Sequence, residues 1–318
     1  MTVIRQDDFI DSVADALQFI SYYHPVDFVQ AVHQAYEREL NPAAKDAMAQ
    51  ILINSRMCAE GHRPICQDTG IVTVFLKIGM DVQWDATLSV ADMVNEGVRR
   101  AYTHPDNVLR ASILEDPAGA RRNTRDNTPA VIHMEVVAGD TVDVQVAAKG
   151  GGSENKSKMV MLNPSDSIVD WVVKTVPTMG AGWCPPGMLG IGIGGTAEKA
   201  AVMAKESLME PIDIHELRER GPSNRAEELR LEIMDAVNKL GIGAQGLGGL
   251  TTVMDVKIMD YPTHAASLPV AMIPNCAATR HAHFVLDGSG PALQTPPDLN
   301  DWPDITWEVG EQVRRVNL

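Results

Sequence analysis

The sequence predicts an α/β fold of the mixed α+β, helix-rich kind, in which a helical N-terminal part is followed by mixed sheets with covering helices. Two observations lead to this prediction. Between Asp8 and Ile53, apolar residues recur at three- and four-residue spacing, which is the period of amphipathic helices. From Ile71 onward, runs of β-branched residues and alternating apolar residues replace that period, which is typical of strands.

Local signals place the next elements in order. Ile71–Ile78 is rich in β-branched residues and is expected to form a strand. Ser89 is expected to cap a helix that extends to Thr103, with Asp92 in its first turn. Residues 115–128 are polar and poor in helix formers, so a long surface or active-site loop is expected there.

The second half of the chain alternates between strands and helices. Val131–Val137 and Thr141–Ala147 show period-two alternation on either side of Gly139, which predicts a β-hairpin. Further helices are expected over Ser165–Thr175, Thr196–Ser207 and Arg225–Leu240, and further strands over Leu250–Ile258 and Pro269–Ile273. Four prolines from Pro291 to Pro303 indicate a linker or a peripheral extension.

Composition and charge limit the classes of function. The 318 residues allow one large domain or two modest ones, and 45% hydrophobic and 22% charged residues are typical of a soluble globular protein. A net charge of -15 argues against general binding to nucleic acid or to acidic membranes. The chain has no basic, apolar signal segment at its start and no apolar run of about 18 residues, so a cytoplasmic protein is expected.

Three of the four cysteines lie on turns bounded by Gly or Pro, namely Cys66, Cys184 and Cys276. Cys58 lies in a helical-looking segment and is expected to be a small buried hydrophobe. Three dispersed thiolates could hold a four-iron cluster with one iron open to substrate, which would act as a Lewis acid. Unrelated loop thiols are the alternative at this point.

Several other residues could carry chemistry, each with a plainer alternative. Asp68 could carry a proton or could simply stabilise a turn. The run Lys149–Lys158 combines three glycines with three lysines, which suits a small anion, although it could be a solvated turn. His264 follows a predicted strand, where loops tend to build sites. Arg110 and Arg280 could each bind a carboxylate with two N–H groups.

Four motifs in this order resemble class I fumarate hydratase and the related iron–sulfur L-tartrate dehydratase α subunit. They are Ile65–Gly70, Ala148–Lys156, Gly182–Gly187, and Pro262–His264 leading to Pro274–Cys276. The resemblance covers nearly the whole chain. It implies an Fe–S hydro-lyase α-type catalytic domain, a homodimer, and the reversible hydration of fumarate to (S)-malate in the tricarboxylic acid cycle.

The same resemblance implies the cofactor and the site residues. An oxygen-sensitive [4Fe–4S] cluster would be held by Cys66, Cys184 and Cys276. Asp68 and His264 would take part in proton transfer. The small dicarboxylate would be contacted by Gln67, Asp68, Arg110, Gly150, Ser153, Glu154, Asn155 and Lys156.

One part of the family pattern is missing from this sequence. The family carries further basic residues and the presumed base in a C-terminal domain with a Lys-x-x-Thr-Gly-Arg type motif, which this sequence lacks. We therefore expect a cluster-binding catalytic domain over residues 1–290 and a Pro-rich linker over 291–318, leading to a missing C-terminal domain or to a separate β subunit. The alternatives are the α subunit of an L-tartrate or related hydroxy-acid dehydratase, and a non-catalytic metal- or anion-binding module.

Overall fold

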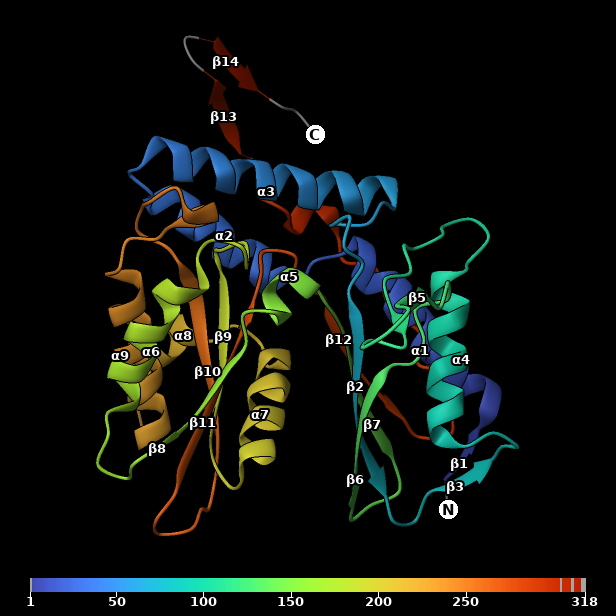
Figure 1. The fold of residues 1–318 in the computed structure, drawn as a ribbon. Coiled ribbons are helices and arrows are strands. Elements are labelled where there is room, and N and C mark those ends of the chain that lie inside the picture. The colour runs from blue at the N-terminus through green and yellow to red at the C-terminus, as the bar shows by residue number, and fades with distance from the viewer. Residues whose placement is uncertain (1, 304, 310–311, 316–318) are drawn as a thin grey trace. The chain divides into compact units, whose positions relative to one another are not determined.

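The computed structural model describes residues 2–303, 305–309 and 312–315, and the chain divides into two compact units (Figure 1). Unit 1 comprises Met1–Pro25, Met57–Gly151 and Arg280–Leu299. Unit 2 comprises Val26–Arg56, Gly152–Thr279 and Asn300–Leu318. Each unit is built from helices packed on a mixed sheet, as the sequence predicts.

Unit 1 is organised around a four-stranded sheet of order β12-β7-β2-β6. Its strands are β2 (Ile71–Gly79), β6 (Val131–Val137), β7 (Val142–Lys149) and β12 (His281–Leu286). Helices α1 (Gln6–Tyr22) and α4 (Val90–Tyr102) pack together beside this sheet, and α1 contacts β7 and β12. The two central strands are largely buried: β2 is buried on both faces over residues 72–76, whereas burial alternates along the first half of β7.

The predicted hairpin over residues 131–147 is wrong, although both of its strands form. β2 lies between β6 and β7, parallel to the former and antiparallel to the latter. The chain therefore reverses direction but skips one strand, with Gly139 at a φ of 122° in the connection. Period-two alternation identifies strands but not their neighbours, because the pairing partner is far away in the sequence.

Other local predictions in unit 1 are confirmed. The Ser89 side chain accepts a hydrogen bond from the backbone N–H of Asp92, which makes it the N-cap of α4. Residues 115–128 are mostly irregular, with only short strands at their start and middle. The short strand pairs of this unit are β1 (Val3–Arg5) with β3 (Gln83–Asp85), and β4 (Leu114–Glu115) with β5 (Arg122–Asn123).

Unit 2 contains a second four-stranded sheet, of order β10-β9-β11-β8. Its strands are β8 (Lys158–Leu162), β9 (Gly187–Gly194), β10 (Val253–Tyr261) and β11 (Leu268–Asn275), with β9 parallel to β10 and antiparallel to β11. The helices of this unit include α2 (Val26–Arg38), α6 (Ile168–Thr175), α7 (Ala197–Glu206), α8 (Ile214–Arg220) and α9 (Arg225–Asn238). The cluster on one face packs α6, α8 and α9 on the sheet, whereas α7 packs on the other face (Figure 1).

β9 was not predicted as a strand because half of its residues are glycines. A Cβ atom on Gly190 would lie 2.1 Å from the carbonyl oxygen of Ala204, and one on Gly192 would lie 1.9 Å from that of Ala200. The glycines therefore let the backbone of α7 pack directly on the strand. This contact depends on the tertiary structure and leaves no strand signal in the sequence.

The remaining predicted helices and strands form with shifts of a few residues at their ends. Helix α3 (Pro42–Gly61) follows α2, and a 3₁₀ helix (Leu299–Asp301) and the strand pair β13 (Thr306–Val309) and β14 (Gln312–Arg315) lie in the Pro-rich region. Within unit 1, Ala292 N–H donates to Ser12, so this region begins against α1. The linker role of 291–318 and the single domain over 1–290 stay predictions. None of the described helices is long and apolar enough to cross a membrane.

Candidate functional site

The carboxylate of Asp68 joins two of the predicted motifs in unit 1. Oδ1 accepts a hydrogen bond from Gly70 N–H at 3.0 Å, and Oδ2 accepts one from Gly151 N–H at 2.7 Å. Gly70 has a φ of 90°, and a Cβ atom there would lie 2.6 Å from the carbonyl carbon of Ala148. Only glycine fits this turn, which sets the cysteine-bearing loop directly beside the end of β7 and the Gly-rich turn that follows it.

The backbone of the same loop is held from three sides within unit 1. Arg280 Nη1 donates to the carbonyl of Asp68 at 2.7 Å. Tyr102 Oη donates to the carbonyl of Thr69 at 2.7 Å, and Asn127 Nδ2 donates to that of Gly70 at 3.1 Å. Burial raises the pKa of Tyr102, so this phenol stays a neutral donor at physiological pH. The loop that carries Cys66 is thus anchored by hydrogen bonds to three consecutive carbonyls, those of residues 68–70.

Arg110 and Gln67 are brought together by the structure. Arg110 Nη1 donates to Gln67 Oε1, and the Arg110 carbonyl accepts a hydrogen bond from the Thr69 hydroxyl. Both long side chains are exposed. Unit 1 therefore presents Gln67 and Arg110 at the surface next to Asp68, with the Lys149–Gly151 backbone adjoining.

Cys184 and Cys276 lie at the same end of the sheet of unit 2. Cys184 precedes β9, whose Met188 pairs with Asn275 at the end of β11. The N–H of Ala277, which follows Cys276, donates to the carbonyl of Cys184 at 3.0 Å. Two cysteines far apart in the sequence are therefore on adjacent turns.

The backbone of Cys184 is strained. Its φ is 56°, in the left-handed region that non-glycine residues rarely adopt, and its residue is exposed. Next to it, the carbonyl of Pro185 accepts hydrogen bonds from both the backbone N–H and the side-chain Nε2 of Gln245, at 2.7 and 2.8 Å. Gln245 was missed by sequence reasoning, although it lies within the Gly241–Gly246 segment, where clustered glycines signal a tight backbone.

The motif Ser153–Lys156 packs beside the Cys184 loop within unit 2. A Cβ atom on Gly182 would lie 3.4 Å from Lys156 Cε, and one on Gly152 would lie 3.2 Å from the Gly182 carbonyl oxygen. Ser153 is buried, whereas Asn155 is exposed. Glu154 forms an ion pair with Lys205 of α7, so its carboxylate has a partner within the protein.

Cys66 belongs to unit 1, while Cys184 and Cys276 belong to unit 2. All four cysteines are described, and none is in a disulfide. Over the described ranges, no group of three or more His, Cys, Asp or Glu side chains is arranged to hold a metal ion. Cys58 is buried in α3 with a pKa raised by burial, as expected of a structural thiol.

His264 does not lie with the cysteines of unit 2. It follows β10, whose last residue Tyr261 pairs with Gly194, whereas Cys184 and Cys276 flank the opposite end of the sheet. Its Nδ1 accepts a hydrogen bond from Ala266 N–H in an exposed turn. The eight residues of β11 span roughly 26 Å, at about 3.3 Å per residue. Within unit 2, His264 and the two cysteines therefore lie at opposite ends of the sheet, and a role for His264 in proton transfer stays a prediction.

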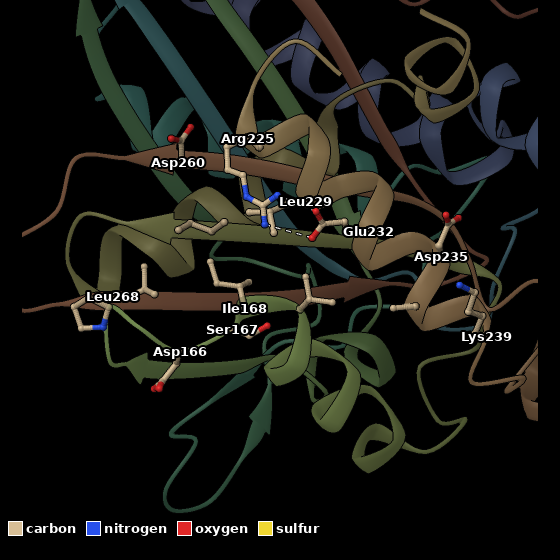
Figure 2. A pocket seen from close by; sticks show the side chains of 15 residues that line it. Asp166, Ser167, Ile168, Arg225, Leu229, Glu232, Asp235, Lys239, Asp260 and Leu268 are labelled. Carbon is tan, nitrogen blue, oxygen red and sulfur yellow. Dashed lines mark hydrogen bonds and ion pairs between the residues drawn. The ribbon is translucent and has the colours of Figure 1, made fainter. Parts of the chain in front are cut away.

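A pocket of about 820 Å³ lies at this same end of unit 2. It is lined by residues of α6, α9 and the sheet, including Ile168, Leu229 and Leu268 (Figure 2). Arg225 and Glu232 lie on the same helix, α9, and form an ion pair along the wall of the pocket (Figure 2). The lining contains none of the predicted site residues, so this pocket is distinct from the candidate site.

Comparison with known proteins gives the family. A model of the family described as "Fumarate hydratase (Fumerase)" matches residues 10–285. A protein of Methanocaldococcus jannaschii, provisionally named L(+)-tartrate dehydratase subunit alpha, is 34% identical over 86% of this chain and 95% of its own length. The L(+)-tartrate dehydratase subunit alpha of Escherichia coli is 29% identical over 84% of this chain and 87% of its own length. That of Shigella sonnei is 28% identical over 86% and 89%, respectively.

The family match and the names of these relatives support a hydro-lyase, an enzyme that adds or removes water across two adjacent carbons. The chain belongs to the fumarate hydratase (Fumerase) family. The resemblance carried by the four sequence motifs is thereby confirmed.

Proposed function

We propose that this chain is the cluster-binding part of an iron–sulfur hydro-lyase that interconverts fumarate and (S)-malate. The observation that carries the proposal is the Asp68 carboxylate, which joins the Cys66 loop to the Gly-rich turn of the family motif. The family match over residues 10–285 supports the reaction class.

We propose Cys66, Cys184 and Cys276 as the ligands of a [4Fe–4S] cluster. The donor set fits, because thiolates are the ligands of such clusters and these three cysteines lie on turns rather than inside helices. Ala277 N–H fixes the Cys184 turn against the Cys276 turn, which supports their joint use. When bound, a cluster with one open iron supplies a Lewis acid that makes a substrate hydroxyl a better leaving group.

The chain's own residues would bind and orient the dicarboxylate. Arg110 supplies a positive charge and Gln67 supplies an amide, both exposed beside Asp68. Lys156 supplies an ammonium group, and the Gly150 turn and Ser153 supply polar atoms. Asp68, held by two backbone N–H groups, is in a fixed position from which it could transfer a proton at its carboxylate. A homodimer and a further domain or β subunit are part of this proposal.

The second candidate is the α subunit of an L-tartrate dehydratase. A specific observation favours it: the curated relatives carry that name and are matched over 87–95% of their own length. Both reactions add or remove water across two adjacent carbons of a four-carbon dicarboxylate, so the same residues would serve either substrate. Under this reading, a β subunit would complete the enzyme.

Two measurements test the proposal. The first is anaerobic iron and sulfide analysis of the reconstituted chain, for which we expect about four irons per chain. Serine at position 66, 184 or 276 should lower the iron content, and Cys58→Ser is the matched control that should retain it. A loss of iron in Cys58→Ser, with iron retained when Cys66, Cys184 or Cys276 is changed to Ser, would contradict the ligand assignment.

The second measurement separates the substrates. The reconstituted enzyme, with any partner subunit it requires, is assayed with fumarate, malate and L-tartrate. Faster turnover of L-tartrate than of malate would favour the second candidate. A chain that holds iron but turns over none of the three would favour a non-catalytic metal- or anion-binding module.

A further inference from the structure

Arg280 has an unusual hydrogen-bond pattern in unit 1. Its residue is 3% exposed, and Nη1 donates to the Asp68 carbonyl at 2.7 Å. Its Nε and Nη2 are buried and have no hydrogen-bond partner among the described residues. Buried polar side-chain atoms nearly always have a hydrogen-bond partner. Burying a charged donor without one is especially unfavourable in free energy.

Nε and Nη2 lie on the same edge of the guanidinium group. This is the edge from which Arg donates two parallel hydrogen bonds to one carboxylate, because Nε–H and one Nη2–H point in the same direction. The third nitrogen, Nη1, is the one that Asp68 uses. One nitrogen, Nη1, therefore holds the side chain in place. The Nε–Nη2 edge, whose geometry suits a carboxylate, makes no hydrogen bond to the described residues.

No carboxylate of the described residues pairs with Arg280. The nearby Asp68 carboxylate is already bonded to the N–H groups of Gly70 and Gly151, and only its backbone carbonyl contacts Arg280. The Arg280 backbone is also fixed, since its carbonyl accepts a hydrogen bond from Ala148 N–H. The guanidinium is thus positioned by strand β7 and by the Cys66–Gly70 loop, and its positive charge forms no ion pair within the described part of the chain.

We propose that the Nε–Nη2 edge of Arg280 binds one carboxylate of the substrate. This inference rests on the proposed function for the substrate class, a four-carbon dicarboxylate. Because both nitrogens are shielded from bulk water, a carboxylate that reaches them gains hydrogen bonds without displacing strong ones to solvent. Arg110, in contrast, is exposed and already bonded to Gln67. The buried arginine therefore provides the stronger and more specific contact.

The first test uses succinate, an unreactive dicarboxylate, and its monoamide as inhibitors of the reconstituted enzyme. Wild type should bind the monoamide about 10- to 100-fold more weakly than succinate. Arg280→Lys keeps a positive charge and a donor for Asp68 but cannot form the two parallel bonds. It should lose most of this discrimination while its iron content and unfolding midpoint stay near wild type. Arg225→Lys, an exposed arginine of α9, is the matched control and should discriminate as wild type does.

Unchanged discrimination in Arg280→Lys would overturn the inference even if the enzyme hydrates fumarate. If the enzyme binds succinate through this edge but turns over no dicarboxylate, the proposed reaction fails and the inference stands. A second measurement needs no variant, in case Arg280→Lys does not fold. A crystal structure of wild type with succinate should place one carboxylate within hydrogen-bond distance of both Nε and Nη2. A water or a protein acceptor at that edge, with succinate bound elsewhere, would overturn the proposal.

Discussion

The backbone N–H of Ala277 donates a hydrogen bond to the carbonyl oxygen of Cys184 at 3.0 Å. This bond joins the turn after β11 to the turn before β9, and the strand pairing of Asn275 with Met188 continues it into the sheet. Two cysteines from distant parts of the sequence are thereby held at one end of the sheet of unit 2. The bond requires the two backbones to lie close together, so a side chain that separates them should break it.

Gly187→Ala should disrupt the contact between the turn before β9 and the turn after β11. A Cβ atom there would lie 1.9 Å from the Asn275 carbonyl oxygen and 3.0 Å from a ring atom of Trp183, so the backbones must separate. We expect a loss of about 1–3 kcal/mol in the free energy of unfolding, measured in urea, and a lower iron content after reconstitution. Gly61→Ala, whose Cβ would meet nothing closer than 3.7 Å, should change stability little. Equal effects of the two substitutions would contradict the packing argument.

The thiols should differ in their reactivity before a cluster is bound. Cys184 is exposed, whereas Cys58 and Cys276 are buried, and burial raises the pKa of Cys58. Iodoacetamide at neutral pH should therefore modify Cys184 first and Cys58 slowly, with the order read from peptide masses. Denatured protein, in which all four thiols are accessible, provides the control. Early modification of Cys58 would contradict its assignment as a structural thiol.

Asp68→Asn should lower turnover by about 10²- to 10⁴-fold if Asp68 transfers a proton. The amide retains one oxygen acceptor for Gly70 or Gly151 but cannot take up the proton, so iron content should remain near that of wild type. Asp81→Asn, at an exposed turn, should leave turnover unchanged. Turnover of Asp68→Asn within a few-fold of wild type would remove Asp68 from proton transfer.

Stability at acid pH should depend on Asp213. Burial acts to raise the pKa of this carboxyl, but hydrogen bonds and charges from Arg230 and Lys257 outweigh it and hold the pKa well below the ordinary 3.8. A carboxyl with a lowered folded-state pKa contributes stability above pH 3.8, and that contribution is lost as the pH falls below it.

Asp213→Asn should therefore cost about 1–2 kcal/mol at pH 7, a figure reduced because the side chain is 40% exposed. Its difference from wild type in urea unfolding should be constant above about pH 4 and should shrink progressively as the pH falls below 3.8 toward the lowered folded-state pKa. Asp235→Asn, which removes an ion pair between exposed side chains, should cost less than Asp213→Asn at pH 7. A difference between Asp213→Asn and wild type that does not change with pH would contradict the argument.

The elements that the sequence predicted well are those with a local cause. The Ser89 cap, the strand at Ile71 and the N-terminal helices depend on residues a few positions apart. The hairpin at residues 131–147 failed because β2, far earlier in the chain, occupies the place between its strands. β9 was missed because its glycines serve contact with α7 rather than strand propensity. In each case, a distant backbone decided the outcome.

Some features of the candidate site could likewise be predicted from the sequence, whereas others depend on the tertiary structure. The motifs around Cys66, Cys184 and Cys276 and the Gly-rich turn were visible in the sequence and identified the family. His264 lies at the end of the unit 2 sheet opposite Cys276, because β11 carries the chain from its turn to Cys276, and its role in proton transfer stays a prediction. Gln245 could not be found, because its double hydrogen bond to Pro185 joins two loops that only the fold brings together.

The sequence by itself determined the residue types of the site, the helices and strands that have a local signal, and the family. The tertiary structure decided which of these groups touch, namely Asp68 with Gly151, and Cys184 with the turn that follows Cys276. It also decided that the Nε–Nη2 edge of Arg280 is buried with no hydrogen-bond partner in the described ranges. The physical reason is that helical periods and turn residues act over a few positions. Strand pairing and burial instead depend on segments that are distant in the chain.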